Sequence, residues 1–207
     1  MPQIRRAEIE DIRRAELIEA AIKVVADFGC DAATVRNIAK TAGVSTASIH
    51  YYFTSKEDLL SAAFREHDRK FIENATAHIA QTEGARERLV MLSQIGFPID
   101  DSANVEWALI LSVFQLAERH ESLKATSDAS HERWLRLVRN IIADGVNAGE
   151  FRGELDPQLL AIEFSALFDG LGIYFYSKQL TSERARLLID GYIASRLVSG
   201  SPSMVRL

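Results

Sequence analysis

The chain has 207 residues, 47% hydrophobic and 26% charged, which is ordinary for one large or two small globular domains. Cys30 is the single cysteine, so a disulfide framework within the chain is excluded. No apolar signal core or bilayer-length apolar run is recognised, which predicts a cytoplasmic protein. The net charge of −5 argues weakly against nucleic-acid binding, yet residues 32–56 hold Arg36, Lys40 and Lys56 and no acidic residue.

Helical periodicity begins near the N-terminus and continues through most of the chain. Gly29 ends the first apolar stripe, in the position that glycine favours after a helix. Thr34 and Ser45 are suitable N-caps for two short helices that Gly43 separates. The expected helices are 12–28, 34–42 and 46–52.

Later helices have equally clear start signals. Residues 55–58 read as a capping box with Asp58 in the glutamate role, and Asp156 followed by Pro157 is a strong N-terminus. No segment shows the alternation of a strand, so the expected class is all-α. The further expected helices are 56–79, 86–96, 102–121, 127–148, 157–176 and 182–197, with a loop at 149–155 and a frayed tail at 199–207.

The two short helices at 34–52 have the pattern of a helix-turn-helix. Small alanines allow the helices to cross closely, and Gly43 can adopt the positive φ that such a turn requires. Ser45 would leave backbone N–H groups pointing outward, where a phosphate can bind. The outer face of residues 46–51 is small or hydrogen-bonding and lacks carboxylates, so it can enter a major groove.

These residues carry a family resemblance. The stretch from Thr34 to Phe53, followed by Ser55-Lys-Glu-Asp-Leu-Leu60, resembles the DNA-binding signature of the TetR family over about residues 15–63. Downstream, Gly149-Glu-Phe151, Asp156-Pro157 and Asp169-Gly-Leu171 resemble the BetI-type branch, named for a choline-responsive repressor. Ala47 and His50 replace the family's usual glycine and tyrosine, so the operator sequence cannot be borrowed from relatives.

The resemblance implies a homodimer whose residues 1–55 read DNA and whose residues 56–207 sense a ligand and dimerise. The predicted DNA-binding residues are Thr34, Arg36, Ser45, Thr46, Ala47, Ser48, His50, Tyr51, Tyr52 and Lys56. Within this set, Tyr52 could equally be packing and His50 equally a solvated side chain. Four arginines of the arm could track phosphates or enter a minor groove, although a solvated arm is an equal reading for the first two: Arg5, Arg6, Arg13 and Arg14.

The predicted effector contacts combine aromatic and polar side chains: Trp107, Phe114, Trp134, Glu106, Gln115, Glu118 and His78. Two indoles beside carboxylates would suit an organic cation through cation–π contact. Core packing of the aromatic residues, and solvation of the polar ones, is the simpler alternative for each residue taken alone.

The predicted dimer interface lies on the last two helices, which the resemblance pairs with their copies. The helix 157–176 is apolar around much of its circumference, whereas a surface helix needs only one stripe. The predicted interface residues are Phe164, Phe168, Leu171, Tyr174, Phe175 and Leu188. A fully buried helix of a monomer is the alternative.

An enzyme is not expected. The chain has no Glu-x-x-His pair, no His-Glu-x-x-His and no glycine-rich phosphate loop, so no catalytic residue, metal or cofactor is predicted. The preferred interpretation is a repressor that a small-molecule effector releases from a pseudo-palindromic operator. The alternatives are a helical ligand-binding or scaffold protein that has lost specific DNA binding, and a regulator with a filled core that answers to no ligand.

Overall fold

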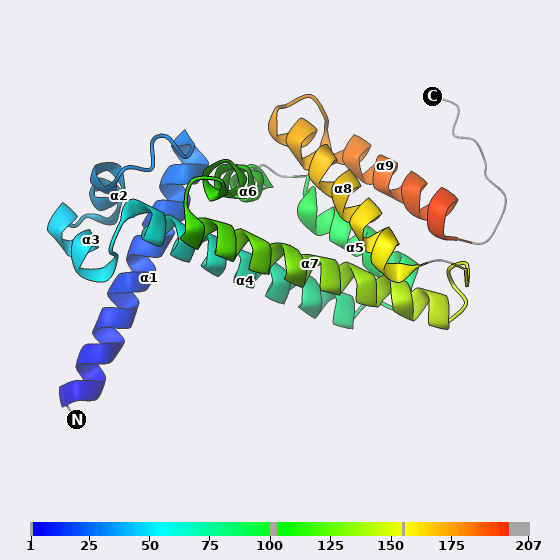
Figure 1. Ribbon diagram of the computed structural model, residues 1–207, viewed down its shortest axis with the longest axis horizontal. Helices are drawn as coiled ribbons and strands as arrows, with labels where there is room; N and C mark the ends of the chain where they lie inside the picture. Colours follow the sequence, from blue (N-terminus) through cyan, green and yellow to red (C-terminus); the bar gives the residue numbers. More distant parts are fainter. Residues whose placement is uncertain (1, 100–102, 155, 199–207) are drawn as a thin grey trace. The chain divides into compact units, whose positions relative to one another are not determined.

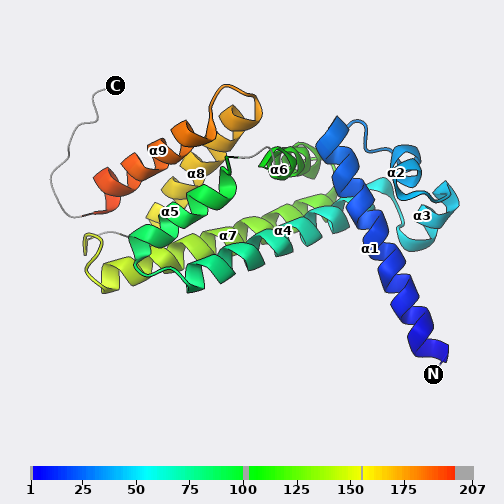
Figure 2. The same ribbon diagram turned by 180° about the vertical axis from the view of Figure 1, so that it is seen from behind.

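The computed structural model describes residues 2–99, 103–154 and 156–198, including all side chains in these ranges except those of residues 2–6, 103 and 104. Within these residues the secondary structure is helical apart from one isolated bridge between Phe151 and Val198 (Figures 1 and 2). The all-α prediction is therefore confirmed. The helices are α1 (Pro2–Phe28), α2 (Val35–Ala42), α3 (Thr46–Tyr52), α4 (Lys56–Ala80), α5 (Ala85–Gly96), α6 (Ala103–Ala117), α7 (Glu121–Asn147), α8 (Pro157–Tyr176) and α9 (Ser182–Tyr192), with a π-helical turn at Ile193–Leu197.

Most expected helix bounds agree with the structure to within a residue. Helix α6 ends at Ala117 rather than at 121, and the last expected helix is α-helical only to Tyr192 rather than to 197. Two further differences, at the starts of helices, have local causes. Helix α1 begins at Pro2 rather than at residue 12, because the arm is rich in good helix formers. Helix α7 begins at Glu121 rather than at 127, and an ion pair between Lys124 and Asp128 one turn apart stabilises its start. The predicted tail at 199–207 lies outside the described residues.

The capping box at the start of α4 is only half formed. Ser55 Oγ accepts the backbone N–H of Asp58 at 3.0 Å, as expected. The Asp58 carboxylate instead accepts from the backbone N–H and the hydroxyl of Thr54, at 3.1 and 3.2 Å. The shorter side chain of aspartate therefore accepts hydrogen bonds from Thr54, the residue before the N-cap, and not from the backbone N–H of the N-cap Ser55.

The chain divides into two compact units, and the first comprises residues 1–70 and 104–130. Its core joins the inner face of α1 to α2, α3 and the first half of α4. Leu17, Ile38, Ile49 and Phe53 are each at most 2% exposed in this core. Residues from α6 and α7 complete it, with Leu109 among them. The short helices α2 and α3 are thus held by a core that extends well beyond them in sequence.

The second unit comprises residues 71–103 and 131–207, of which the described part contains α5, α8 and α9. Phe97 at the end of α5 packs against Phe168 and Phe175 of α8, with ring centroids 4.9 and 5.8 Å apart. Helices α8 and α9 lie side by side in both views (Figures 1 and 2). The Arg186 guanidinium on α9 donates to the carbonyl of Phe97 at 2.8 Å and so fastens α9 to the end of α5.

Helix α8 corrects one expectation of the sequence analysis. By length and composition alone it could cross a membrane, with a mean hydropathy of 1.4, although no such run was expected. Its apolar character has a local explanation, because one side of the helix fills the core of the second unit. Phe164, for example, is completely buried there. A core helix with a second apolar face passes the same test as a membrane span.

Candidate nucleic-acid interface

Two N-caps and a C-terminal glycine define the helix-turn-helix of α2 and α3. Thr34 Oγ1 accepts the N–H of Asn37 at 3.2 Å and begins α2. Gly43 ends it with φ +69°, a left-handed conformation that costs other residues free energy, and donates its N–H to carbonyls of the last turn. Ser45 Oγ then accepts the N–H of Ser48 at 3.1 Å and begins α3. Both predicted N-caps and the glycine turn are confirmed.

The inner residues of α3 determine which of its faces is outward. Ile49 and Phe53 are 1% and 2% exposed, so the opposite side of the helix is turned to solvent. Tyr51 is 65% exposed there and stacks edge-on against Tyr52, with centroids 4.9 Å apart. Exposed members of the predicted DNA-binding set are Thr34, Arg36, Ser45, Thr46, Ala47, His50 and Tyr51, and partly exposed members are Ser48, Tyr52 and Lys56. None is buried, so all ten remain available to a ligand, and their DNA contacts remain predictions.

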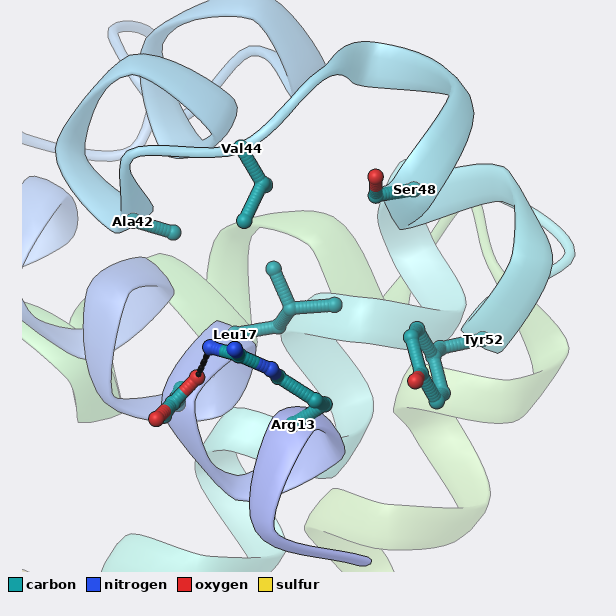
Figure 3. A pocket seen from close by; sticks show the side chains of 7 residues that line it. Arg13, Leu17, Ala42, Val44, Ser48 and Tyr52 are labelled. Atoms are coloured by element: carbon teal, nitrogen blue, oxygen red, sulfur yellow. Dashed lines mark hydrogen bonds and ion pairs between the residues drawn. The ribbon is translucent and has the colours of Figure 1, made fainter. Parts of the chain in front are cut away.

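A hollow of about 310 Å³ lies between α1 and the α2–α3 pair (Figure 3). Ala42 and Val44 of the turn form one wall, and Ser48 and Tyr52 of α3 form another. Arg13 borders it from α1 and donates to the carboxylate of Glu16 at 2.7 Å. The hollow therefore has an arginine–glutamate pair of α1 on one side and the partly exposed Ser48 and Tyr52 of α3 on the other.

The arginines of the arm differ in what they contact. The Arg14 guanidinium carbon lies 5.0 Å from the centroid of the buried Phe53 ring, a cation–π contact that ties α1 to the end of α3. Arg13 borders the hollow described above and is more than half exposed. The side chains of Arg5 and Arg6 lie outside the described residues.

One contact at this surface was missed by the sequence analysis. The Tyr51 hydroxyl donates to the carboxylate of Glu10 at 3.3 Å, across 41 residues of sequence. Residues 32–56 contain no acidic residue, but Glu10 lies outside this stretch and before residue 12, where the expected first helix begins. Once the first turns of α1 are helical, they bring a carboxylate to the face of α3.

The predicted effector contacts divide between the two units. In the first, Trp107 is 2% exposed and belongs to the interior, whereas Phe114 is 47% exposed. Gln115 and Glu118 are exposed as well. In the second, His78 is exposed and its Nδ1 lies 2.8 Å from the carbonyl of Asn74 in its own helix. Burial therefore agrees with core packing for Trp107, and none of these contacts is tested by the structure.

Among the predicted effector contacts, Trp134 lies in an aromatic cluster and has a polar atom that no described residue satisfies. Its ring centroid lies 4.9 Å from that of Phe168 and 6.5 Å from that of Phe164, within the second unit. Its Nε1 is buried and has no hydrogen-bond partner among the described residues. Buried indole N–H groups are normally satisfied, so this one is free to donate to a bound molecule. Asp169 follows Phe168 on α8, and burial raises the pKa of its carboxyl to about 6.

Glu106 on α6 gives a pH-dependent prediction. Burial raises the pKa of its carboxyl from an ordinary 4.5 to about 7. Between these values the folded chain holds a proton that the unfolded chain has released, so the free energy of unfolding falls as the pH rises. We expect Glu106→Gln to reduce the loss of stability between pH 5 and pH 8 by about 2 kcal/mol, measured by urea unfolding. The exposed Glu118→Gln is the control, and an unchanged pH dependence in Glu106→Gln would contradict the assignment.

The predicted dimer interface needs a correction at four of its six residues. Phe164, Phe168, Leu171 and Phe175 are at most 9% exposed, because their own protomer covers them. Tyr174 and Leu188 are about half exposed and remain available to a partner. The other side of α8 carries a stripe of exposed residues, with the partly exposed Gly170 among them, at three- and four-residue spacing: Leu159, Ile162, Ala166, Gly170 and Ile173. We call these five residues the α8 stripe.

The geometry defines a class of protein. Two capped helices joined at a left-handed glycine present the exposed side of α3, whose own residues include no carboxylate, and this is the arrangement of a helix-turn-helix DNA-binding protein. Residues 17–63 match the family described as bacterial regulatory proteins, tetR family. Residues 85–198 match the BetI-type transcriptional repressor C-terminal family. The chain belongs to the TetR family of transcriptional regulators and has a BetI-type C-terminal part.

Individual relatives agree with this assignment. The HTH-type transcriptional regulator BetI of Rhizobium meliloti is 31% identical over 191 residues, covering 91% of each chain. A putative transcriptional regulator from Saccharomonospora viridis, solved in complex with choline, is 28% identical with a TM-score of 0.84, over 90% of this chain and 98% of that one. The regulator FadR from Bacillus subtilis, solved with stearoyl-CoA, is 24% identical with a TM-score of 0.75. The match covers 90% of this chain and 98% of that one. The last likeness concerns the fold alone.

Proposed function

We propose that this protein is a cytoplasmic repressor that binds a pseudo-palindromic operator as a homodimer and is released by a small molecule. The outward face of α3 is the observation that carries the proposal. It is exposed, short enough to fit a major groove and free of carboxylates along residues 32–56. Residues 1–55 would read the operator, and residues 56–207 would dimerise and sense the ligand.

The α8 stripe supports the homodimer. Its large members Leu159, Ile162 and Ile173 are each about half exposed, and such a row on one helix exceeds the scattered apolar residues of an ordinary surface. A side chain built at Gly170 would meet no atom within 4 Å, and the same holds for Gly191 on α9. Glycine at open positions allows a partner helix to approach closely. Two-fold pairing would present two α3 helices about one DNA turn apart, roughly 34 Å.

The effector would bind near Trp134. Its buried indole N–H lacks a partner among the described residues, and the rings of Phe164 and Phe168 lie beside it. Aromatic faces together with the largely buried carboxyl of Asp169, which follows Phe168 on α8, would suit an organic cation. An effector need shift the operator affinity by only about 1–3 kcal/mol to be useful. That free energy would arise because the effector binds more tightly to the dimer conformation in which the spacing of the two α3 helices does not fit the operator.

Substitutions on the interface distinguish contacts to bases from contacts to phosphates. We expect Tyr51→Phe and Lys56→Ala to weaken binding to all duplexes alike, because phosphates carry no sequence information. Arg36→Ala and Thr46→Ala should also change which sequences are preferred, by about 1–3 kcal/mol at the affected base pair. Fluorescence anisotropy across a panel of duplex variants measures both effects.

The same panel separates the proposal from its alternatives. Unchanged affinity in all four variants would contradict the role of α3. Wild-type protein that binds no duplex even at low salt would favour a ligand-binding or scaffold protein that has lost DNA binding. We propose no catalytic role for this protein, because the relatives described above are regulators.

A further inference from the structure

The contact between α1 and α3 involves two side chains with opposite consequences for DNA binding. Tyr51 is 65% exposed on the outward face of α3, and its hydroxyl donates to Glu10 on α1. Figure 1 shows the early turns of α1 continuing past the α2–α3 pair. In the proposed complex the Tyr51 hydroxyl donates to a phosphate of the DNA. In the free protein the same hydroxyl already donates to the carboxylate of Glu10.

The chemistry of the phenol makes these two partners compete. A tyrosine hydroxyl has one proton to donate, and both a carboxylate and a phosphate diester act only as acceptors. The hydroxyl can therefore donate to Glu10 or to the DNA, but not fully to both. A phosphate that reaches Tyr51 also comes close to the charge of Glu10, at a partly solvated site where like charges still repel.

We propose that Glu10 is an inhibitory residue of the DNA interface: it occupies the Tyr51 hydroxyl in the free protein and repels the phosphate that would replace it. This inference rests on the proposed operator binding. Glu10 keeps the affinity for DNA of any sequence low, because it acts on a phosphate contact. Contacts between the rest of α3 and the bases therefore contribute a larger share of the free energy of operator binding.

The test compares two carboxylates of the same helix. Glu10→Gln removes the charge that faces Tyr51 and keeps an amide oxygen that can still accept its proton. Glu8→Gln removes one charge two residues earlier, about 200° around the helix. Both are exposed or partly exposed, so neither substitution should disturb the fold. The probe is a fluorescent duplex of random sequence at low salt, with each variant also prepared in a Tyr51→Phe background.

We expect Glu10→Gln to tighten binding about fivefold, and Glu8→Gln by less than about twofold, because only the first charge lies at the contact. In the Tyr51→Phe background the gain from Glu10→Gln should fall to about twofold or less. Equal effects of the two charge removals, or an undiminished gain without the Tyr51 hydroxyl, would overturn the inference while leaving the operator proposal intact. Wild-type protein that binds no duplex would overturn both.

Discussion

Phe53→Ala should lower the free energy of unfolding by about 3–5 kcal/mol, the usual cost of truncating a fully buried phenylalanine. Phe53 is 2% exposed at the C-terminal end of α3, and the guanidinium of Arg14 lies over its ring. Its removal leaves a cavity at the point where α1, α3 and the shared core meet. Because α3 has only seven residues, it depends on this packing and not on its own helical stability.

The same substitution at Phe28 is the matched control. Phe28 is 71% exposed at the end of α1, so Phe28→Ala should change stability by no more than about 0.5 kcal/mol. Urea unfolding followed by circular dichroism measures both variants. A loss below about 1 kcal/mol in Phe53→Ala would show that α3 is held by something other than the core described here. DNA binding should weaken in Phe53→Ala and remain unchanged in Phe28→Ala.

The second large effect concerns the α8 stripe. Ile162 is 48% exposed near the middle of that face, so Ile162→Arg should leave the protomer folded. In a symmetric dimer, however, each of two copies would place an unpaired guanidinium in an apolar contact, which is costly. We expect the dimer dissociation constant to rise about 100-fold or more. Sedimentation over a concentration series measures it directly.

Ile12→Arg provides the control for that experiment. Ile12 is 58% exposed on α1, so the substitution adds the same charge at a similarly exposed isoleucine outside α8 and α9. It should leave the dissociation constant unchanged. A wild-type chain that sediments as a monomer at every concentration, or an Ile162→Arg protein that dimerises normally, would contradict the assignment of this face.

Local sequence signals predicted the helix-turn-helix well. The N-caps Thr34 and Ser45 and the turn at Gly43 act within four residues, so their spacing alone defines α2 and α3. The N-cap Asp156 with Pro157 determined the start of α8 in the same way. Signals of this kind depend on backbone hydrogen bonds that the chain forms with its immediate neighbours, and they need no tertiary context.

The errors arose where tertiary packing selects between faces. The apolar pattern of α8 covers two sides, and the sequence could not tell which side belongs to the core and which to the surface. Phe164 and Phe168 were assigned to the partner because the helix is apolar around much of its circumference, yet these large rings fill the core of their own protomer. Glu10 was missed for a related reason, since it lies in a part of α1 that begins before residue 12, where the sequence predicted no helix.

The most direct test of the whole account is selection of bound sequences from a pool of random duplex DNA with the wild-type protein. The account predicts enrichment of one motif with approximate two-fold symmetry and half-sites about one helical turn apart. Binding to the enriched motif should weaken steeply with salt. Retention of the pool without enrichment of any motif, or enrichment of a single unrepeated half-site, would contradict a symmetric pair of α3 helices reading DNA.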